Sequence, residues 1–269
     1  MPGLAGRTAL VTGGGRGIGR AIALDLAAAG VNVAIAARTR AEIDAVAREL
    51  VLGHRDAPGA LAGVKAVALQ ADVADPASVR TLFRDARAAL GDLDILVNGA
   101  GVAPTAPLVK TTDEQWRQAI EVNLSGAFYC LREALPSMTA RGWGRVVNVA
   151  SIAGKTGIPY IAAYAASKHG LLGLTKVAAL EVAARGVTVN AVCPSYVRTP
   201  LVEKQIADQA KAHGMSAEDV VTQIMLEPAA IKRLLEPSEV AAYVSFLCSD
   251  DASGITGATQ VIDCGWTAR

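Results

Sequence analysis

The sequence predicts an α/β protein of a single domain, in which seven parallel strands form a doubly wound sheet with helices on both faces. Short apolar runs rich in β-branched residues alternate with longer amphipathic stretches, a pattern typical of βαβ units. A glycine-rich turn follows the first run and opens a helical stretch. The length of 269 residues and the hydrophobic content of 52% are sufficient for one substantial core.

Seven strands are expected where apolar, β-branched runs of five to eight residues are bounded by polar or glycine-containing segments. In a doubly wound sheet, ligands bind outside the carboxyl ends of the strands, and we therefore expect the functional site there. In chain order the runs are TALVT (8–12), VNVAIA (31–36), VKAVALQ (64–70), LDILVN (93–98), GRVVNVAS (144–151), VTVNAVC (187–193) and ATQVID (258–263).

The segments between these strands have the length and patterning of helices. Asp75 precedes Pro76, which predicts a helix N-terminus, because aspartate caps free N–H groups and proline fits the first helical position. The run from Thr112 to Gln115 matches a capping box and predicts a second N-terminus.

Two segments depart from the regular alternation. Residues 51–63 form a Gly- and Pro-containing connection after the second helix, which we expect to be a surface excursion. Residues 199–236 form a long stretch before the last helix and strand, which we expect to be a substrate lid. Since the sequence shows no internal repeat or low-complexity linker, residues 1–269 are expected to form one domain.

The charge balance gives no broad electrostatic reason to expect nucleic acid or an anionic membrane as a partner. Lys plus Arg number 26, Asp plus Glu number 25, and the net charge is +1. The four cysteines are scattered and form no CxxC pair, which predicts core thiols in a reducing compartment and no metal site. No signal peptide or membrane span is recognisable. We therefore expect a cytoplasmic protein whose partner is a small molecule.

The segment TGGGRGIG, Thr12 to Gly19, follows the first predicted strand. Gly13, Gly17 and Gly19 allow a tight turn and a close approach of the backbone to a pyrophosphate, which the N-terminus of the following helix attracts. In this strand-to-helix context the segment predicts nucleotide binding rather than an ordinary tight turn.

The end of the second strand bears on which dinucleotide is bound. An acidic residue there usually binds the ribose 2′-hydroxyl of NAD, whereas an arginine accommodates the 2′-phosphate of NADP. Here the strand is followed by Arg38, with no acid before Glu42. Arg38, with Arg16 of the glycine turn, can form charge-assisted bonds to a phosphate. The sequence therefore favours NADP(H) over NAD(H), and Arg38 as a solvated cap of the next helix is the alternative.

Tyr164 and Lys168 in YAASKHG are four residues apart, which places them on one face of a helix. A nearby ammonium lowers the pKa of a phenol, so this pair can exchange a proton with a carbonyl or alcohol oxygen. Ser151 ends the fifth predicted strand, where its hydroxyl can hold a substrate oxygen. Asn123 lies in a helical pattern that its propensity does not favour, which predicts either a buried amide bonded to backbone or a polar relay behind Lys168. His169 points to another side of the helix.

These motifs resemble those of the short-chain dehydrogenase/reductase family, with its Rossmann-like fold, over nearly the whole chain. TGxxxGxG matches Thr12 to Gly19, and the serine lies thirteen residues before the tyrosine of YxxxK. The resemblance implies that Ser151 polarises a ketone carbonyl and that Tyr164 gives it a proton. It also implies that Lys168 lowers the tyrosine pKa and holds the nicotinamide ribose, and that Asn123 anchors a water through which the proton is replaced.

The resemblance assigns the cofactor to the glycine turn and to the ends of later strands. The sequence departs from the family's motifs at Gly99, in place of the second asparagine of NNAG, at Ser195, in place of a glycine, and at Cys264, in place of the first glycine of DGG. The expected cofactor-binding residues are Gly13, Arg16, Gly17, Ile18, Gly19, Arg38, Asp72, Val73, Asn98, Tyr164, Lys168, Val197 and Thr199.

Two subfamilies compete for the substrate. Residues 154–176 and 189–200 resemble ketoacyl-carrier-protein and aromatic polyketide ketoreductases, which reduce a β-keto thioester with NADPH. Residues 197–206 and 262–269 resemble D-3-hydroxybutyrate dehydrogenases, which use NAD.

The second subfamily binds its small carboxylate with polar side chains, of which only some match here. Gln205 and Trp266 match, whereas Ala103, Ala153 and Ile161 replace a glutamine, a histidine and a lysine. An apolar wall cannot replace these donors, because a buried charge without partners is costly. We therefore expect an NADPH-dependent reductase of a larger, more apolar ketone, with a β-ketoacyl thioester or polyketide as the leading candidate.

Two alternatives stay open. One is an NAD(P)-dependent dehydrogenase of a 3-hydroxy acid or another secondary alcohol. The other is a catalytically silent nucleotide-binding sensor or scaffold, against which the intact catalytic set argues. A carrier-linked substrate calls for a basic patch near the mouth, to which Arg132, Arg141 and Arg198 are candidate contributors. The resemblance also implies a homo-oligomer, either a dimer or a tetramer.

Overall fold

The computed structural model describes residues 1–52 and 63–268, so most of the predicted surface connection, residues 53–62, lies outside the described residues. Within the described residues one sheet contains seven strands: β1 (Thr8–Thr12), β2 (Asn32–Ala37), β3 (Ala66–Gln70), β4 (Ile95–Asn98), β5 (Gly144–Val149), β6 (Val187–Pro194) and β7 (Thr259–Ile262). All neighbours are parallel, in the order β3-β2-β1-β4-β5-β6-β7, which confirms the predicted doubly wound architecture.

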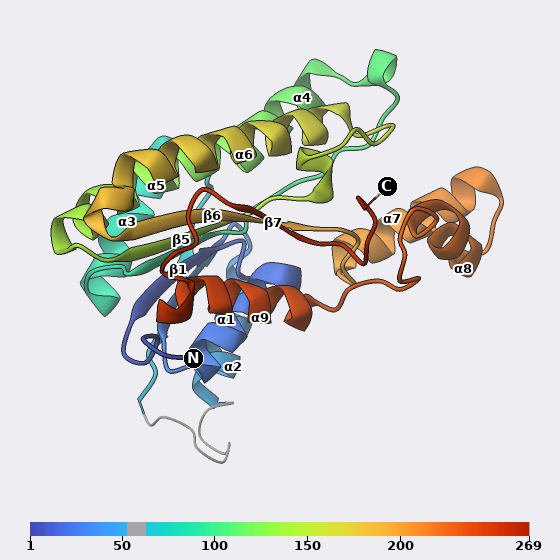
Figure 1. Ribbon diagram of the computed structural model, residues 1–269. Coiled ribbons are helices and arrows are strands. Elements are labelled where there is room, and N and C mark those ends of the chain that lie inside the picture. The colour runs from blue at the N-terminus through green and yellow to red at the C-terminus, as the bar shows by residue number, and fades with distance from the viewer. Residues whose placement is uncertain (53–62, 269) are drawn as a thin grey trace.

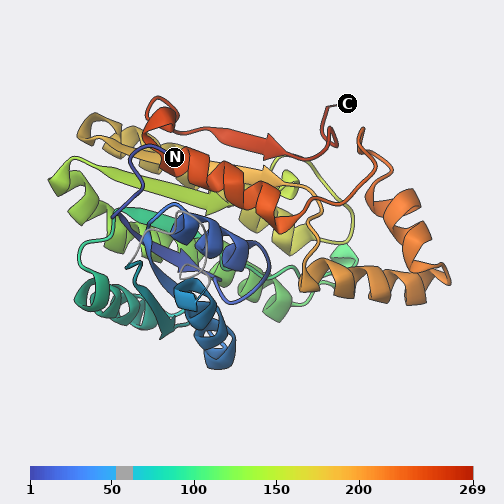
Figure 2. The same cartoon turned by 90° about the horizontal axis from the view of Figure 1, so that it is seen from below.

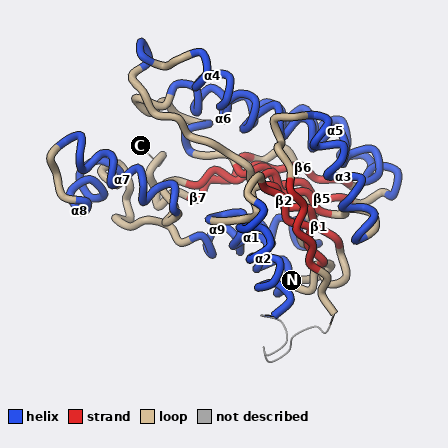
Figure 3. Tube along the Cα trace, turned by 180° about the vertical axis from the view of Figure 1, so that it is seen from behind, coloured by secondary structure: helices blue, strands red, loops and turns tan. Residues whose placement is uncertain are grey.

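Helices cover both faces of this sheet (Figure 1). They are α1 (Gly17–Ala28), α2 (Arg40–Leu52), α3 (Pro76–Leu90), α4 (Asp113–Ile120), α5 (Gly126–Arg141), α6 (Ala162–Val182), α7 (Pro200–His213), α8 (Ala217–Asp219) and α9 (Pro237–Cys248). α1, α2 and α9 cover one face of the sheet, as the view from below shows (Figure 2), and the core beneath them includes Ile22 and Leu247. α3, α5 and α6 pack on the other face around Phe83 and Met138, and the strands lie between the two layers (Figure 3). None of the described helices is long and apolar enough to cross a membrane.

Short helical turns connect several of these elements. One π-helical turn, η2 (Glu121–Ser125), joins α4 to α5, and another, η5 (Val220–Met225), follows α8. The 3-10 turns are η1 (Leu108–Lys110), η3 (Ile152–Gly154), η4 (Ala183–Arg185) and η6 (Asp250–Ala252).

The two predicted helix starts are confirmed. The Asp75 carboxylate accepts the N–H of Ala77 at 2.8 Å, with Pro76 as the first residue of α3. Thr112 and Gln115 form the capping box of α4. Both caps satisfy N–H groups that have no acceptor within the helix.

The order of strands reverses between β1 and β4, which places a crevice at their carboxyl ends. β1 pairs with β2 on one side and with β4 on the other, and Thr12 lies opposite Asn98 in the register. The connections from these two strands leave toward opposite faces of the sheet, and the crevice between them is where ligands bind in sheets of this kind.

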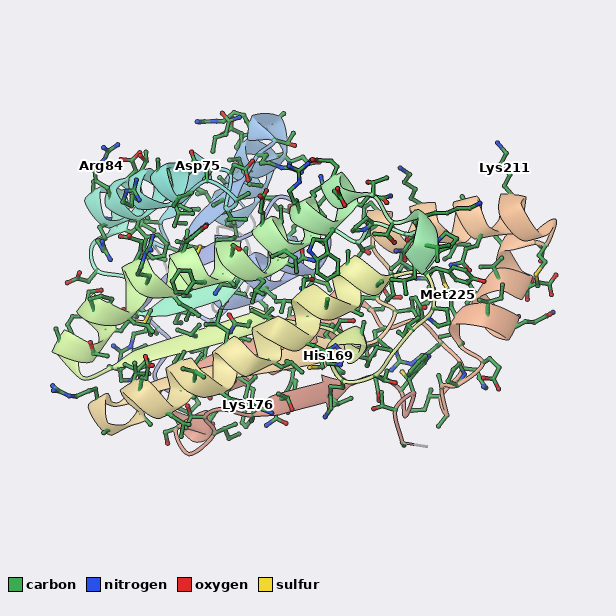
Figure 4. All side chains as sticks on the ribbon, turned by 90° about the horizontal axis from the view of Figure 1, so that it is seen from above. Asp75, Arg84, His169, Lys176, Lys211 and Met225 are labelled. Atoms are coloured by element: carbon green, nitrogen blue, oxygen red, sulfur yellow. The ribbon has the colours of Figure 1, made fainter. Side chains whose placement is uncertain are left out.

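The predicted lid segment, residues 199–236, projects beyond the sheet, with Lys211 extending outward from α7 (Figure 4). The Thr199 side chain accepts the N–H of Val202 at the start of α7, and Glu236 caps α9 at the other end. The buried apolar side chains of this segment form a cluster of their own: Val202, Ile206, Val220, Met225, Leu226, Ala229 and Leu234.

Candidate active site

A cleft of about 290 Å³ opens at the carboxyl ends of the central strands. Its wall comes from the glycine turn, from the ends of β2, β4, β5 and β6, and from the start of α7. The cleft is therefore at the edge that the topology predicts. The predicted site residues that line it are Gly13, Arg16, Gly17, Ile18, Gly19, Arg38, Asp72, Val73, Ser151, Tyr164, Lys168, Val197 and Thr199.

The backbone of the glycine turn packs so closely on the loop after β4 that Gly13 has no room for a side chain. Gly13 has a φ of +69°, and a Cβ there would lie 2.6 Å from the carbonyl oxygen of Gly99. Gly17, with a φ of +55°, starts α1 beside Thr199. In this described segment the Arg16 side chain makes no capping bond and the first turn of α1 holds no acid. The free N–H groups and the positive end of the helix are thus left for an anion, which fits the pyrophosphate of a dinucleotide.

Two arginines lie where the second strand meets the cleft. Arg16 pairs with Glu42, its Nη1 lying 3.4 Å from Oε1 of that carboxylate. Arg38 is exposed, and among the described residues its guanidinium has no ion-pair partner. Glu42 lines the cleft as well, and the sequence did not point to it because it lies in the helix after the strand.

Thr12 holds the loop after β4 in place, a role that sequence reasoning missed. Its Oγ1 donates to Val97 O at 3.3 Å and accepts the N–H groups of Gly99 at 3.2 Å and Ala100 at 3.4 Å. Gly99 and Ala100 line the cleft, so this hydroxyl fixes part of its wall. A threonine ending a strand gives no such signal in the sequence, because the two bonded segments are far apart along the chain.

Asn98 does not offer its side chain to the cleft. It is buried, and its Nδ2 donates to Oδ1 of Asn148 at 2.8 Å on the neighbouring strand. The resemblance to the family placed this residue among the cofactor contacts. In the structure its side chain lies on the face of the sheet that α6 covers, beside Asn148, whose amide donates to Thr175 of α6.

Ser151, Tyr164 and Lys168 come together at one end of the cleft. Ser151 lies two residues after β5, and its Oγ accepts the N–H of Ala153 at 3.1 Å at the start of η3. Tyr164 is in the first turn of α6, and Lys168 follows one turn later. The Lys168 Nζ donates to Val149 O at 2.7 Å and lies 5.6 Å from the centroid of the Tyr164 ring.

Burial shapes the charge states of this group. The pKa of Tyr164 lies above its ordinary value because burial disfavours the phenolate, and a hydrogen bond with Ser151 opposes this rise. Burial lowers the pKa of Lys168 to about 8. The expected fall in the pKa of Tyr164 is therefore not found in the protein alone, because burial is the largest influence on this pKa. The phenol is protonated at neutral pH.

Asn123 lies in the π-helical turn η2 rather than in a regular helix. Its Oδ1 accepts the N–H of Val102 at 2.8 Å, while its Nδ2 donates to Val102 O and to Ser167 Oγ, both at 2.9 Å. The amide therefore joins the loop after β4 to α6, with both of its ends engaged. His169, labelled in Figure 4, is exposed and its ring contacts Ala165 O at 2.9 Å.

The three candidate arginines of a basic patch each have a partner within the chain. Arg132 stacks on aromatic rings of its own helix, Arg141 pairs with two aspartates, and Arg198 pairs with two glutamates. Arg141 ends α5 just before β5 begins, at the amino edge of the sheet and away from the cleft. Arg141 therefore does not contribute to a patch at the mouth, and the contribution of Arg132 and Arg198 stays a prediction.

Comparisons with known proteins cover almost the whole chain. A family profile described as enoyl-(acyl carrier protein) reductase matches residues 13–267. D-beta-hydroxybutyrate dehydrogenase of Rhizobium meliloti (strain 1021) is 41% identical over 98% of this chain and 99% of its own length. The 3-oxoacyl-[acyl-carrier-protein] reductase of Staphylococcus aureus (strain Mu50 / ATCC 700699) is 38% identical over 96% of this chain and 97% of its own length. A crystal structure of a variant of actinorhodin polyketide ketoreductase with NADPH covers 100% of both chains, with 34% identity and a TM-score of 0.90.

The fold, the cleft at the switch point and these relatives define a dinucleotide-dependent oxidoreductase. The chain belongs to the short-chain dehydrogenase/reductase family. The protein is an enzyme of ketone and secondary alcohol oxidation–reduction.

Proposed function

We propose that the protein is an NADPH-dependent reductase that converts an apolar ketone to a secondary alcohol, with a β-ketoacyl thioester or polyketide as the leading substrate. The observation that carries the proposal is the group of Ser151, Tyr164 and Lys168 at one end of the cleft that begins at the glycine turn. When bound, NADPH supplies the hydride, and the protein contributes orientation and charge.

Each residue of this group has a role that follows from its position. The Ser151 hydroxyl donates to the carbonyl oxygen of the substrate and polarises it. Tyr164, whose pKa burial raises, gives its phenol proton to that oxygen. The buried Lys168 ammonium stabilises the phenolate that the transfer leaves and holds the nicotinamide ribose. Since both ends of the Asn123 side chain are bonded, we propose that it supports the site by clamping the loop at Val102 to α6.

The proposed preference for NADPH over NADH is based on the charged residues that line the cleft near the end of β2. Arg38 is free to pair with a 2′-phosphate, and Arg16 lies beside it on the glycine turn. Glu42 is held by Arg16, which reduces its repulsion of a phosphate. The NADPH named with the actinorhodin ketoreductase structure supports the same choice.

The walls near Ser151 support an apolar substrate. Ala153 is buried and Ile161 is half-buried, and neither offers a donor to a carboxylate. Trp266 donates its indole N–H to Met225 O at 3.2 Å, so its polar atom is already engaged. A carboxylate bound beside Ala153 and Ile161 would find no donor in either side chain, and burial of a charge without partners is unfavourable.

A second candidate function is oxidation of a 3-hydroxy acid, which the 41% identity to D-beta-hydroxybutyrate dehydrogenase favours. Gln205 on α7 is half-buried and remains available for a carboxylate. We favour the reductase because the other polar positions of that subfamily are apolar here.

A substrate panel tests the proposal. NADPH and NADH oxidation is measured with acetoacetate, a short β-ketoacyl thioester and bulky cyclic ketones. We expect the thioester or a cyclic ketone to give the highest kcat/KM, and Tyr164→Phe to lose turnover while NADPH still binds. Acetoacetate as the best substrate would establish the second function, and full turnover of Tyr164→Phe would remove the mechanism.

The same proposal includes the cellular location and the oligomeric state of the enzyme. We expect a cytoplasmic homo-oligomer, a dimer or tetramer. Three of the four free cysteines are buried, and burial raises the pKa of Cys130 and of Cys248 to about 12, which suits thiols that stay reduced.

A further inference from the structure

Behind the cleft, three polar side chains form a buried hydrogen-bonded chain between the sheet and α6. Asn98 Nδ2 donates to Asn148 Oδ1 at 2.8 Å, and Asn148 Nδ2 donates to Thr175 Oγ1 at 2.8 Å. Asn98 is 5% exposed, and the other two residues are 0% exposed. Buried polar groups are unfavourable unless they are bonded, so such a chain calls for a reason.

The direction of this chain is determined at each step. Asn98 and Asn148 are paired residues of β4 and β5, and the Asn98 amide donates across the pair. The oxygen of Asn148 is therefore turned to β4, and its NH₂ group is turned to α6. The Thr175 hydroxyl donates its only proton to Leu171 O at 2.7 Å, so it accepts from Asn148.

Two adjacent residues of β5 hold α6 at two places. The carbonyl of Val149 accepts the Lys168 ammonium at 2.7 Å, and the side chain of Asn148 holds Thr175. Lys168 and Thr175 are seven residues apart, which is about two helical turns, so they lie on the same face of α6. The bond at Thr175 thus sets the rotation and the position along β5 of the helix that carries Lys168.

We propose that Asn148 and Thr175 are positioning residues for Lys168: they fix α6 on β5 and so hold the lysine ammonium at Val149 O, beside Tyr164. The lysine stem has four rotatable carbons, and its ammonium can take many positions unless the helix that carries it is fixed. The inference rests on the role proposed above for Lys168. It adds a second set of residues to the reaction, out of contact with substrate and cofactor.

The test compares three variants of the full chain. Thr175→Val removes the hydroxyl that accepts the bond from Asn148, with little change in volume, and Thr175→Ser keeps that hydroxyl. Val182→Ala opens a cavity on the same face of α6 and leaves the hydrogen bonds from Asn98 to Thr175 in place. Two quantities are measured: kcat and KM for the reduction, and the pKa of Lys168 by NMR titration of ¹³Cε-lysine-labelled protein without cofactor. Lys168→Met identifies the lysine signal.

We expect Thr175→Val to lower kcat by roughly tenfold with little change in KM, because the misplaced ammonium acts on the chemical step. The pKa of Lys168 shifts in the same variant. Thr175→Ser retains both wild-type values. Val182→Ala lowers the thermal midpoint and leaves both values unchanged.

Two results would overturn the inference. One is a Thr175→Val protein with wild-type kcat and Lys168 pKa. The other is a Val182→Ala protein that changes both quantities as Thr175→Val does, since any loss of packing would then suffice. Full activity of Lys168→Met is a different outcome. It would remove the catalytic role of the lysine, and the cofactor-free pKa measurement would still decide whether Thr175 positions it.

Discussion

The Lys168 side chain is buried at one end of the cleft. Because its pKa is about 8, we expect the reaction to be sensitive to alkaline pH. The charge is present below this pKa and is lost above it. If the ammonium stabilises the phenolate left by proton transfer, as proposed, kcat/KM for ketone reduction is expected to be level below about pH 8 and to fall about tenfold per pH unit above it. A pH–rate profile with NADPH measures this.

The control for that profile is Lys168→Arg, because a guanidinium stays charged across the range. If this variant retains activity, its alkaline fall should move to higher pH. A wild-type profile that stays level to pH 10 would show that the lysine charge is not required.

Cofactor preference is a second property that we expect a single residue, Arg38, to determine. We expect Arg38→Asp to raise the KM for NADPH by roughly tenfold or more, because a charge-assisted bond to the 2′-phosphate is replaced by repulsion. The KM for NADH should change little or fall. The matched control is Arg40→Asp, two residues away, where Arg40 pairs with Asp44 and lies outside the cleft lining. An unchanged ratio of the KM values for NADPH and NADH in Arg38→Asp would show that the guanidinium does not bind the 2′-phosphate.

Residue identities at the site could be predicted better than their environments. The spacing of Ser151, Tyr164 and Lys168 in the sequence was sufficient to predict that they lie together, and all three line the cleft. The direction of the Tyr164 pKa was not predictable, because it depends on how deeply the folded chain buries the phenol. The contact of Glu42 with Arg16 joins α2 to the glycine turn, and no sequence signal marks it because their approach depends on the folded sheet.

We expect cofactor binding to depend strongly on the glycine turn. We expect Gly13→Ala to raise the KM for NADPH strongly, because the added Cβ would lie 2.6 Å from Gly99 O and the φ of +69° is unfavourable for alanine. Gly142→Ala is the matched control, since Gly142 has a φ of +70° at the end of α5 and no atom of the described residues lies within 4 Å of a Cβ there. It should lose about 1 kcal/mol of stability and keep the KM. Equal cofactor affinity in both variants would contradict the close packing of the turn.

At the scale of elements, the sequence predicted helix N-termini reliably where the capping residues lie close to the N–H groups that they bond. Proline after Asp75 and the box from Thr112 to Gln115 lie within a few residues of the groups they satisfy. The π-helical turn around Asn123 has no comparable signal, because the extra residue is accommodated by bonds to Val102 and Ser167 on other elements. The seven strands were predictable because most of their residues are apolar and many are β-branched, as is typical of strands covered on both faces.

For the whole molecule, exposed apolar side chains on α5 and α6 indicate association. Phe128, Val177 and Leu180 are 43%, 54% and 84% exposed. We expect a dimer or tetramer by light scattering in solution, and a lower mass for the double variant Val177→Glu, Leu180→Glu. Val109→Glu, which changes a residue 92% exposed on η1, should keep the wild-type mass. A monomeric wild-type protein would contradict the expectation.

The separate apolar cluster of the lid segment has a consequence for how this enzyme could change its substrate. Residues 199–236 pack largely around their own side chains, and besides the two chain junctions they contact the C-terminal residues, where Cys264 O accepts the N–H of Ala230 and Trp266 donates to Met225 O. We expect an exchange of this stretch, together with the C-terminal residues it contacts, for those of a relative to replace the outer wall and to leave the glycine turn, Ser151 and α6 intact. Recombination of these two pieces would then change the substrate range without many separate mutations.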